Sequence, residues 1–270
     1  MPFRALRRSF VSTLASLGSS LFCIILPASC RLCHRPLRHA GRVPVCPACL
    51  EAVALLELPG CRQCGQYFAA VESSLDGRCL NCIAHPPAYS AALCATAYAG
   101  SAKELIHLLK FDGVESLAGF WAGRLLPLVG RLPMAPEMIV AVPLGRKHLA
   151  KRGYNQSAIV ARQLARELGR HDQDCRFEPR AMRRVRETLP QSGLDAVARA
   201  RNVAGAFRAE RRYVAGRRVL LIDDVLTTGA TASAAAKALC AAGAAEVALL
   251  TLARADLESA RAVQLGEAVA

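Results

Sequence analysis

Residues 219–231 limit the possible folds of this chain more than any other stretch, and they read Val-Leu-Leu-Ile-Asp-Asp-Val-Leu-Thr-Thr-Gly-Ala-Thr. The four apolar residues at the start are typical of a buried parallel strand. Two adjacent carboxylates, Asp223 and Asp224, stand where that strand is expected to end. A turn of small residues follows, and an alanine-rich segment to about residue 242 predicts a helix. The stretch therefore predicts a strand, a turn and a helix of an α/β fold.

This arrangement also predicts a site for a phosphorylated sugar. The turn and the N-terminus of the helix present unpaired N–H groups and a positive dipole end to an anion. Gly229 lets the backbone approach the ligand closely, and the neighbouring threonine hydroxyls can donate hydrogen bonds. Two adjacent carboxylates can accept hydrogen bonds from vicinal sugar hydroxyls, or bind a divalent cation. In an open α/β sheet, ligands bind at this edge.

The stretch resembles the 5-phosphoribosyl-1-pyrophosphate (PRPP) motif of type I phosphoribosyltransferases, in which four apolar and two acidic residues precede a Thr/Gly loop. The resemblance implies that Asp223 and Asp224 bind the ribose hydroxyls. It also implies that a loop binds the 5′-phosphate, made of Thr227, Thr228, Gly229, Ala230 and Thr231. The alternative is an ordinary buried strand that ends in a solvated turn.

Eight of the 12 cysteines form four Cys-x-x-Cys pairs, namely Cys30 with Cys33, Cys46 with Cys49, Cys61 with Cys64, and Cys79 with Cys82. Two such pairs supply the four thiolates of a tetrahedral zinc site, so eight cysteines fill two sites with a structural role. Sequential pairing is the simplest arrangement, and cross-bracing stays open. An iron–sulfur cluster and redox dithiols are the alternatives. Such clustering favours metal binding in a reducing cytoplasm over a disulfide scaffold.

The formal net charge of +14 and the pI of about 9.6 favour anionic partners, such as phosphates, pyrophosphate or nucleic acid. A solvated basic surface is the alternative. At 270 residues the chain has room for one ordinary domain and a smaller one. The basic, apolar N-terminus resembles a signal peptide, but its spacing also fits an amphipathic helix over residues 1–27. It is short for a membrane span, and serines dilute it.

Between the cysteines and the PRPP-like motif, the pattern alternates between apolar strands and amphipathic helices. This alternation predicts a doubly wound parallel sheet with right-handed crossovers. A strand at residues 138–142 leads into a basic loop, which predicts a pyrophosphate clamp made of Arg146, Lys147, Lys151 and Arg152. A solvated loop is the alternative there.

Residues 180–194 read as a second basic loop, and long loops in compact domains are often functional lids. Its candidate lid residues are Arg184, Arg186 and Gln191.

Taken together, these segments are similar to the ComF family of competence-related proteins, which includes the GntX proteins. The similarity runs nearly end to end, through the cysteine pairs, the PRPP-like stretch, Leu105-Ile-x-x-Leu-Lys-Phe-x-Gly113, Lys151-Arg-Gly-Tyr-Asn-Gln156 and Arg184-x-Arg-x-Thr-x-x-Gln191. It implies an amphipathic helix (1–27), a double zinc ribbon (28–86), a phosphoribosyltransferase-like domain (87–256) and a tail (257–270). It also implies a role in DNA uptake during natural transformation.

Two functions follow from this resemblance. The first is a phosphoribosyltransferase that binds PRPP with Mg²⁺, without an assigned acceptor or catalytic residue. The second is a PRPP- or nucleotide-sensing module that binds single-stranded DNA or other DNA-uptake proteins. One departure bears on the choice, because purine-salvage relatives carry an aspartate two residues before the loop glycine and this chain carries Thr227. A purely structural zinc adaptor would leave the PRPP-like motif unexplained.

Overall fold

The computed structural model describes residues 28–37, 42–56, 60–66, 76–188 and 196–255. The chain forms two compact units, residues 1–54 and 55–270. The expected cysteine module, residues 28–86, therefore spans the boundary between the units. The expected N-terminal helix and C-terminal tail lie outside the described residues.

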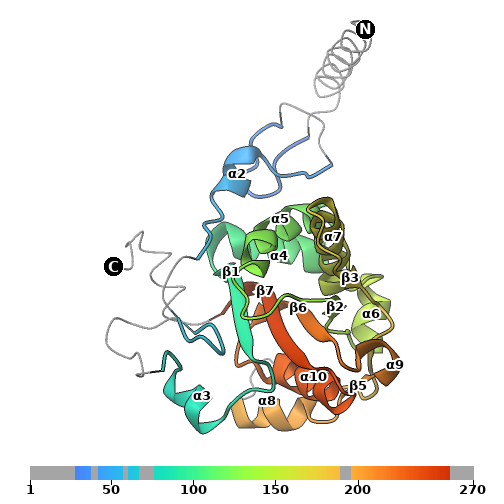
Figure 1. The fold of residues 1–270 in the computed structure, drawn as a ribbon. Coiled ribbons are helices and arrows are strands. Elements are labelled where there is room, and N and C mark those ends of the chain that lie inside the picture. Colours follow the sequence, from blue (N-terminus) through green and yellow to red (C-terminus); the bar gives the residue numbers. More distant parts are fainter. Residues whose placement is uncertain (1–27, 38–41, 57–59, 67–75, 189–195, 256–270) are drawn as a thin grey trace, which may run out of the picture. The chain divides into compact units, whose positions relative to one another are not determined.

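A five-stranded parallel sheet forms the centre of the second unit (Figure 1). Its strand order is β1 (Ala91–Ala97), β7 (Glu246–Arg254), β6 (Arg218–Leu226), β2 (Met138–Ala141) and β3 (Arg176–Phe177). All four neighbouring pairs are parallel. The doubly wound α/β fold expected from the sequence is confirmed.

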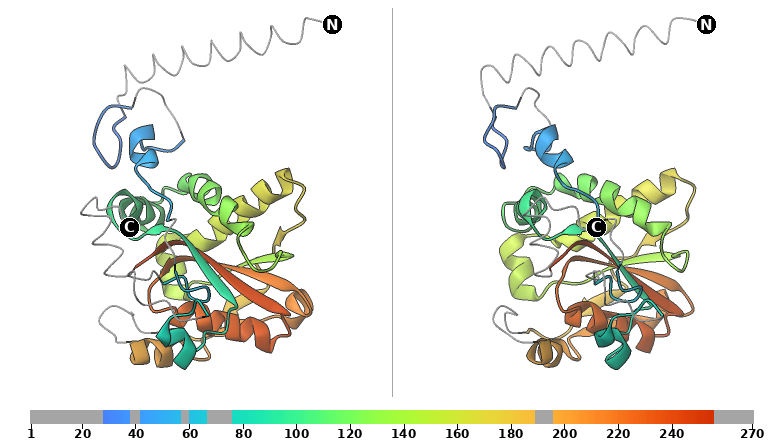
Figure 2. Two further views of the ribbon diagram at one scale, coloured as in Figure 1. Left: turned by 60° about the vertical axis from the view of Figure 1, so that its left-hand side comes forward. Right: turned by 90° about the vertical axis from the view of Figure 1, so that its left-hand side faces the viewer.

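Helices cover both faces of this sheet (Figures 1 and 2). On one face lie α4 (Gly100–Phe111), α5 (Leu117–Val129) and α7 (Gln156–Arg170), with α5 packed against α7. The other face is covered by α10 (Ala230–Ala241), which also packs against α8 (Ala196–Val203). With both faces covered, the central strands are apolar without alternation, which explains the continuous buried runs in β6 and β7.

Helix α7 begins where the sequence signals a start. The side chain of Asn155 accepts hydrogen bonds from the N–H groups of Ser157 and Ala158, at 3.0 and 3.3 Å. Asn155 also donates a hydrogen bond to the carbonyl of Val142 at 2.9 Å. This cap satisfies two helix donors and ties the helix start to the end of β2.

Two segments expected to be loops contain regular structure. Residues Arg146–Arg152 form α6, which ends at Gly153 with a φ of 80°. The sequence was interpreted as a basic loop here, but a seven-residue helix fits between Gly145 and Gly153. Residues Met182–Arg184 form β4, which pairs antiparallel with β5 (Phe207–Ala209). That pairing joins segments more than twenty residues apart, so no local pattern reveals it.

Four short helices complete the described structure: α2 (Pro47–Glu51), α3 (Leu80–Ala84), α6 and α9 (Arg211–Val214). Helix α2 belongs to the first unit, and the other three belong to the second. Across the described ranges, every helix is too short or too polar to cross a bilayer.

Candidate functional site

The acidic pair lies near the C-terminal end of β6. The strand continues two residues past the pair to Leu226, rather than ending at it as the sequence suggested. Lys110, from the last turn of α4, forms an ion pair with Asp224 at 2.9 Å, and both side chains are 14% exposed. Gln156, the first residue of α7, donates a hydrogen bond to the other oxygen of Asp224. Asp224 is therefore held by groups from two helices.

Asp223 has a different environment. Its carboxylate accepts a hydrogen bond from the N–H of Asp224 at 2.9 Å and a longer one, at 3.4 Å, from Ser157 Oγ. Burial and the neighbouring charge of Asp224 raise the pKa of Asp223 to about 7. The Asp223 carboxyl group therefore titrates near neutral pH. Binding of sugar hydroxyls or a cation would favour its charged form.

This raised pKa predicts how stability depends on pH. Between about pH 4 and pH 7 the unfolded chain releases the Asp223 proton while the folded chain keeps it. The contribution of Asp223 to the free energy of unfolding therefore falls across that interval and levels off above it. Urea unfolding at several pH values should show this fall in the wild type and not in Asp223→Asn. Parallel pH profiles for the two proteins would contradict the shift.

The loop after β6 turns sharply at Gly229, whose φ is 77°. A side chain there would be strained by the left-handed backbone, and its Cβ would lie 3.0 Å from the hydroxyl of Tyr89. Gly229 is the N-cap of α10 and no side chain caps that helix. The first N–H groups of α10 therefore lack intrahelical partners, which makes the loop suitable for an anion.

The acidic pair and the loop line one cavity of about 450 Å³. Its wall includes Asp223, Asp224, Thr227, Gly229, Ala230 and Thr231. Thr228 is exposed and is not among the lining residues. The structure thus brings together six of the seven residues that the sequence predicted for PRPP.

The predicted pyrophosphate clamp is only partly assembled. Arg152 lines the cavity and donates a hydrogen bond to Gln156 Oε1 at 2.9 Å. Arg146, Lys147 and Lys151 are exposed on α6 and do not line it. These three side chains do not line the cavity because a helix points successive side chains in different directions around its axis. A loop could have let all four basic side chains converge on one ligand.

Glu187 lies against the start of α6. Its carboxylate accepts a hydrogen bond from the N–H of Arg146 at 2.5 Å, and a Cβ on Gly145 would lie 2.5 Å from it. The Glu187 carboxylate, from the expected lid segment, therefore occupies the position from which a phosphate could accept a hydrogen bond from the N–H of Arg146.

The lid residues separate in the structure. Arg184 lines the cavity and donates a hydrogen bond to Thr188, which also lines it. Burial lowers the pKa of Arg184, and the negative charges of Glu187 and Asp223 partly offset this lowering. Arg186 instead donates to the carbonyls of Asn202 and Ala204, at 2.9 and 2.6 Å, at the C-terminal end of α8. Gln191 lies outside the described residues.

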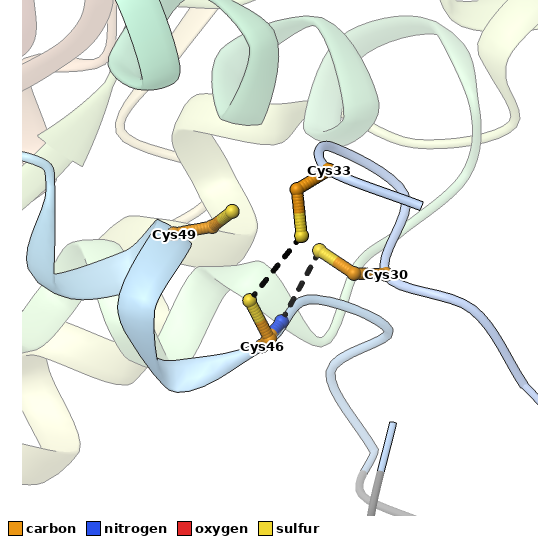
Figure 3. A group of neighbouring side chains, drawn as sticks. All are labelled: Cys30, Cys33, Cys46 and Cys49. Atoms are coloured by element: carbon orange, nitrogen blue, oxygen red, sulfur yellow. Dashed lines mark hydrogen bonds between the residues drawn. The ribbon is translucent and has the colours of Figure 1, made fainter. Parts of the chain in front are cut away.

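The cysteines form two tetrads of sequential pairs, which is the simplest pairing expected from the sequence. In each tetrad the four sulfur atoms lie within 4.8 Å of one another. Figure 3 shows the first tetrad, Cys30, Cys33, Cys46 and Cys49, with the four sulfurs turned toward a common centre. The second consists of Cys61, Cys64, Cys79 and Cys82, and all four are buried. Four convergent thiols match the tetrahedral sulfur set of a structural zinc ion, so each tetrad could hold one.

The two tetrads repeat one design. The N–H of Cys46 donates to Cys30 Sγ at 3.3 Å, and that of Cys79 donates to Cys61 Sγ at the same distance. Although burial raises the pKa of each acceptor thiol, backbone hydrogen bonds outweigh it and lower the pKa to about 6 for Cys30 and about 7 for Cys61. Such bonds stabilise the thiolate, which is the form that binds a metal.

Comparison with known proteins identifies the chain. A phosphoribosyl transferase domain matches residues 150–264. The DNA utilization protein YhgH of Escherichia coli is 34% identical over 236 residues, which cover 86% of this chain and 99% of that protein. The chain belongs to the ComF/YhgH family. The Competence protein F of Haemophilus influenzae is 30% identical over 232 residues, 80% of this chain and 93% of its own length.

A solved structure, the glutamine PRPP amidotransferase from B. subtilis, is similar at 21% identity and a TM-score of 0.36. The matched region covers 54% of this chain and 30% of the amidotransferase chain. The fold of this ComF/YhgH protein rests instead on the matched phosphoribosyl transferase domain and on its own parallel sheet.

Sequence reasoning did not assign five residues of the site in this ComF/YhgH protein. Tyr98, Lys110, His148 and Gln156 line the cavity, and Ser157 contacts Asp223. They come from four segments that are distant in sequence from the acidic pair. Lys110 and Gln156 lie inside motifs that carried the family resemblance. The presence of these two polar residues in the motifs was the available signal.

Proposed function

We propose that the cavity binds PRPP together with Mg²⁺, and that the protein uses this ligand in DNA utilization. The observation that carries the proposal is the shared cavity of the acidic pair and the small-residue loop. Its volume of about 450 Å³ suits a small ligand. In this proposal the 5′-phosphate binds the loop and the first turn of α10, and two ribose hydroxyls bind Asp223 and Asp224.

The pyrophosphate of PRPP then binds on the β2 side of the cavity. Pro143, Leu144, His148 and Arg152 line that side, and Arg184 lines the cavity from β4. Mg²⁺ bound with the pyrophosphate would offset its negative charge. The exposed Arg146, Lys147 and Lys151 serve at longer range, where they attract the anionic ligand. Glu187 must leave the N–H of Arg146 before a phosphate oxygen can accept from it.

In the transfer reaction, the bond between ribose C1 and a pyrophosphate oxygen breaks, and its electron pair leaves with pyrophosphate. A nitrogen atom of the acceptor forms the new bond to C1 as C1 passes through an oxocarbenium-like state, and the proton that this nitrogen loses goes to pyrophosphate or to solvent. The protein contributes by stabilising charge, with Arg152 and Arg184 near the leaving group. The segment that contains Glu187 and Thr188 excludes water as a lid.

Calorimetry of the full chain with PRPP, with and without Mg²⁺, tests the binding step. We expect binding that depends on Mg²⁺. A pyrophosphate-release assay over a set of nitrogenous acceptors tests transfer. Absence of binding at millimolar PRPP and Mg²⁺ would refute the proposal.

The second candidate function is a sensor that binds PRPP without turnover. Thr227, at the position where purine-salvage relatives carry an aspartate that serves the base, favours it. Binding of PRPP without release of pyrophosphate across the acceptor set would support this candidate. In both functions the tetrads hold two structural zinc ions, and the protein works in the cytoplasm with other DNA-uptake proteins.

A role with DNA also predicts direct binding of a single strand. With a net charge of +14, binding should rest largely on phosphate contacts and release counterions. The logarithm of the affinity should therefore fall linearly with the logarithm of the salt concentration, with a slope of about −0.7 per contact. Anisotropy of a labelled oligothymidylate at several salt concentrations measures the slope. Competition by PRPP would place the strand at the cavity, and no binding at low salt would make the DNA role indirect.

A further inference from the structure

Arg254 joins the second cysteine tetrad to the end of the sheet. It is the last residue of β7 and is only 6% exposed. Its guanidinium donates a hydrogen bond to the carbonyl of Cys64, a member of that tetrad, at 2.7 Å. A buried cation is costly unless acceptors are held in place around it. The turn that carries Cys64 therefore helps to fix the Arg254 side chain, and with it the end of β7.

The end of β7 lies beside the start of the phosphate loop, which we define as residues 227–231. Arg254 pairs with Leu226 in the register of β7 and β6. The N–H of Ala255 donates to the carbonyl of Leu226 at 2.8 Å, and both of these residues line the cavity. Because Leu226 directly precedes the phosphate loop, a shift of Arg254 would also shift the start of that loop.

Tyr89 supports the same loop from outside the cavity lining. It is 3% exposed, and a Cβ on Gly229 would lie 3.0 Å from its hydroxyl. The ring thus leaves little room for a side chain at the turn of the loop. Burial raises the pKa of Tyr89, the nearby charges of Cys64 and Cys82 raise it further, and Arg254 lowers it. Tyr89 therefore lies between the second tetrad and the phosphate loop.

We propose that Arg254 and Tyr89 are positioning residues that couple the second tetrad to the phosphate loop, so that zinc in this tetrad raises the affinity for PRPP. Zinc would hold four thiolates at one centre and so fix the turn at Cys64. Coupling between two sites is reciprocal, so bound PRPP also helps to retain this zinc by the same factor. The inference rests on the proposed PRPP site and adds metal-dependent control of its affinity.

Arg254→Met tests the link with all eight cysteines of the tetrads in place. Methionine keeps an unbranched side chain but removes the hydrogen bond to Cys64. Elemental analysis should still find about two zinc ions per chain. Calorimetry should show PRPP binding about tenfold weaker than in the wild type, within the range of about 5- to 150-fold for coupled sites. Arg254→Lys keeps a donor and should recover part of the affinity. Unchanged PRPP affinity in Arg254→Met would overturn the proposal.

The chain supplies a matched control in Arg218, the first residue of β6. Its Nε also donates to a backbone carbonyl, that of Ala135, at 2.7 Å, but it lies at the opposite end of the strand from the phosphate loop. Arg218→Met should bind PRPP as the wild type does, and a loss equal to that of Arg254→Met would count against the coupling.

Tyr89→Phe carries the test if Arg254→Met does not fold, because it removes only the hydroxyl beside Gly229. This variant should keep about two zinc ions and bind PRPP more weakly than the wild type. Wild-type affinity in Tyr89→Phe would then refute the proposal.

Zinc release separates positioning from a general loss of stability. In Cys33→Ser only the second tetrad keeps four cysteines, so a chelator selective for zinc over magnesium reports on that tetrad. PRPP with Mg²⁺ should slow the release about tenfold in Cys33→Ser, but not in the double variant Cys33→Ser, Arg254→Met. A double variant that is merely less stable would lose zinc faster with and without PRPP, and the ratio of the two rates would hold. Equal protection by PRPP in the two proteins would therefore overturn the proposal.

PRPP calorimetry on the wild type keeps the two proposals distinct. Failure of the wild type to bind PRPP refutes the proposed function. Binding of PRPP that responds neither to Arg254→Met nor to Tyr89→Phe refutes the coupling alone.

Discussion

Replacing Cys61 by serine should remove one of two zinc ions and destabilise the whole second unit. Cys61 is buried in the second tetrad, where it accepts hydrogen bonds from the N–H groups of Cys64 and Cys79. A structural zinc site contributes about 10–16 kcal/mol of apparent binding free energy in small zinc domains, and that energy supports folding. Loss of one thiolate ligand forfeits much of it. Elemental analysis should fall from about two zinc ions per chain to about one.

The effect should reach the sheet because the second tetrad is joined to it. Arg254, the last residue of β7, donates a hydrogen bond to the carbonyl of Cys64 at 2.7 Å. A Cβ on Gly65 would lie 2.7 Å from the carbonyl oxygen of Ala92, so the turn after the first pair lies directly on β1. The N–H of Leu56 also donates to the carbonyl of Ala95 at 3.0 Å. The melting temperature of the sheet should therefore fall in Cys61→Ser.

Two other cysteines provide matched controls. Cys33→Ser should also lose one zinc ion, but it lies in the other compact unit, so the melting temperature of the sheet should hold. Cys240 is exposed on α10 and outside both tetrads, so Cys240→Ser should keep about two zinc ions and normal stability. Purified wild-type protein that folds without any metal would refute the zinc sites.

The sequence was most informative where a chemical requirement is local. The acidic pair, Gly229 and the loop threonines are contiguous, and the strand, turn and helix that position them follow from apolar runs and small residues. The cysteine pairs could equally be recognised from the sequence, because a metal site requires fixed ligand types at short spacing. The parallel sheet followed from the alternation of strands and helices.

The rest depends on contacts between distant segments. The ion pair of Lys110 with Asp224 joins residues 114 positions apart, and no local pattern encodes it. The pairing of β4 with β5 is equally non-local. The shape of the segment with the predicted pyrophosphate clamp was wrong for a local reason, because residues 146–152 were expected to form a loop and form a helix. In a helix only Arg152 of the four clamp residues meets the cavity.

Asp223→Ala and Asp224→Ala should each weaken PRPP binding by about 1.5–3 kcal/mol, because in the proposed complex each carboxylate accepts charge-assisted hydrogen bonds from ribose hydroxyls. At 25 °C that range corresponds to a loss of affinity of about tenfold to 150-fold. Calorimetry with Mg²⁺ present measures it. The asparagine variants of both positions keep the side-chain volume and remove the charge, so they separate loss of charge from loss of packing.

Asp224 requires one further variant, because its removal leaves Lys110 without this anion at a site where the lysine is 14% exposed. Leaving a charge unpaired in a partly buried site destabilises the fold. In the double variant Lys110→Met, Asp224→Asn, the unpaired charge is gone but the ribose ligand is still missing, so stability should recover and PRPP affinity should not. Asp174→Ala is the control, since Asp174 is an 81% exposed carboxylate that pairs with Arg176 and does not line the cavity. If the double variant regains PRPP affinity along with stability, Asp224 supports the fold and does not bind the ribose.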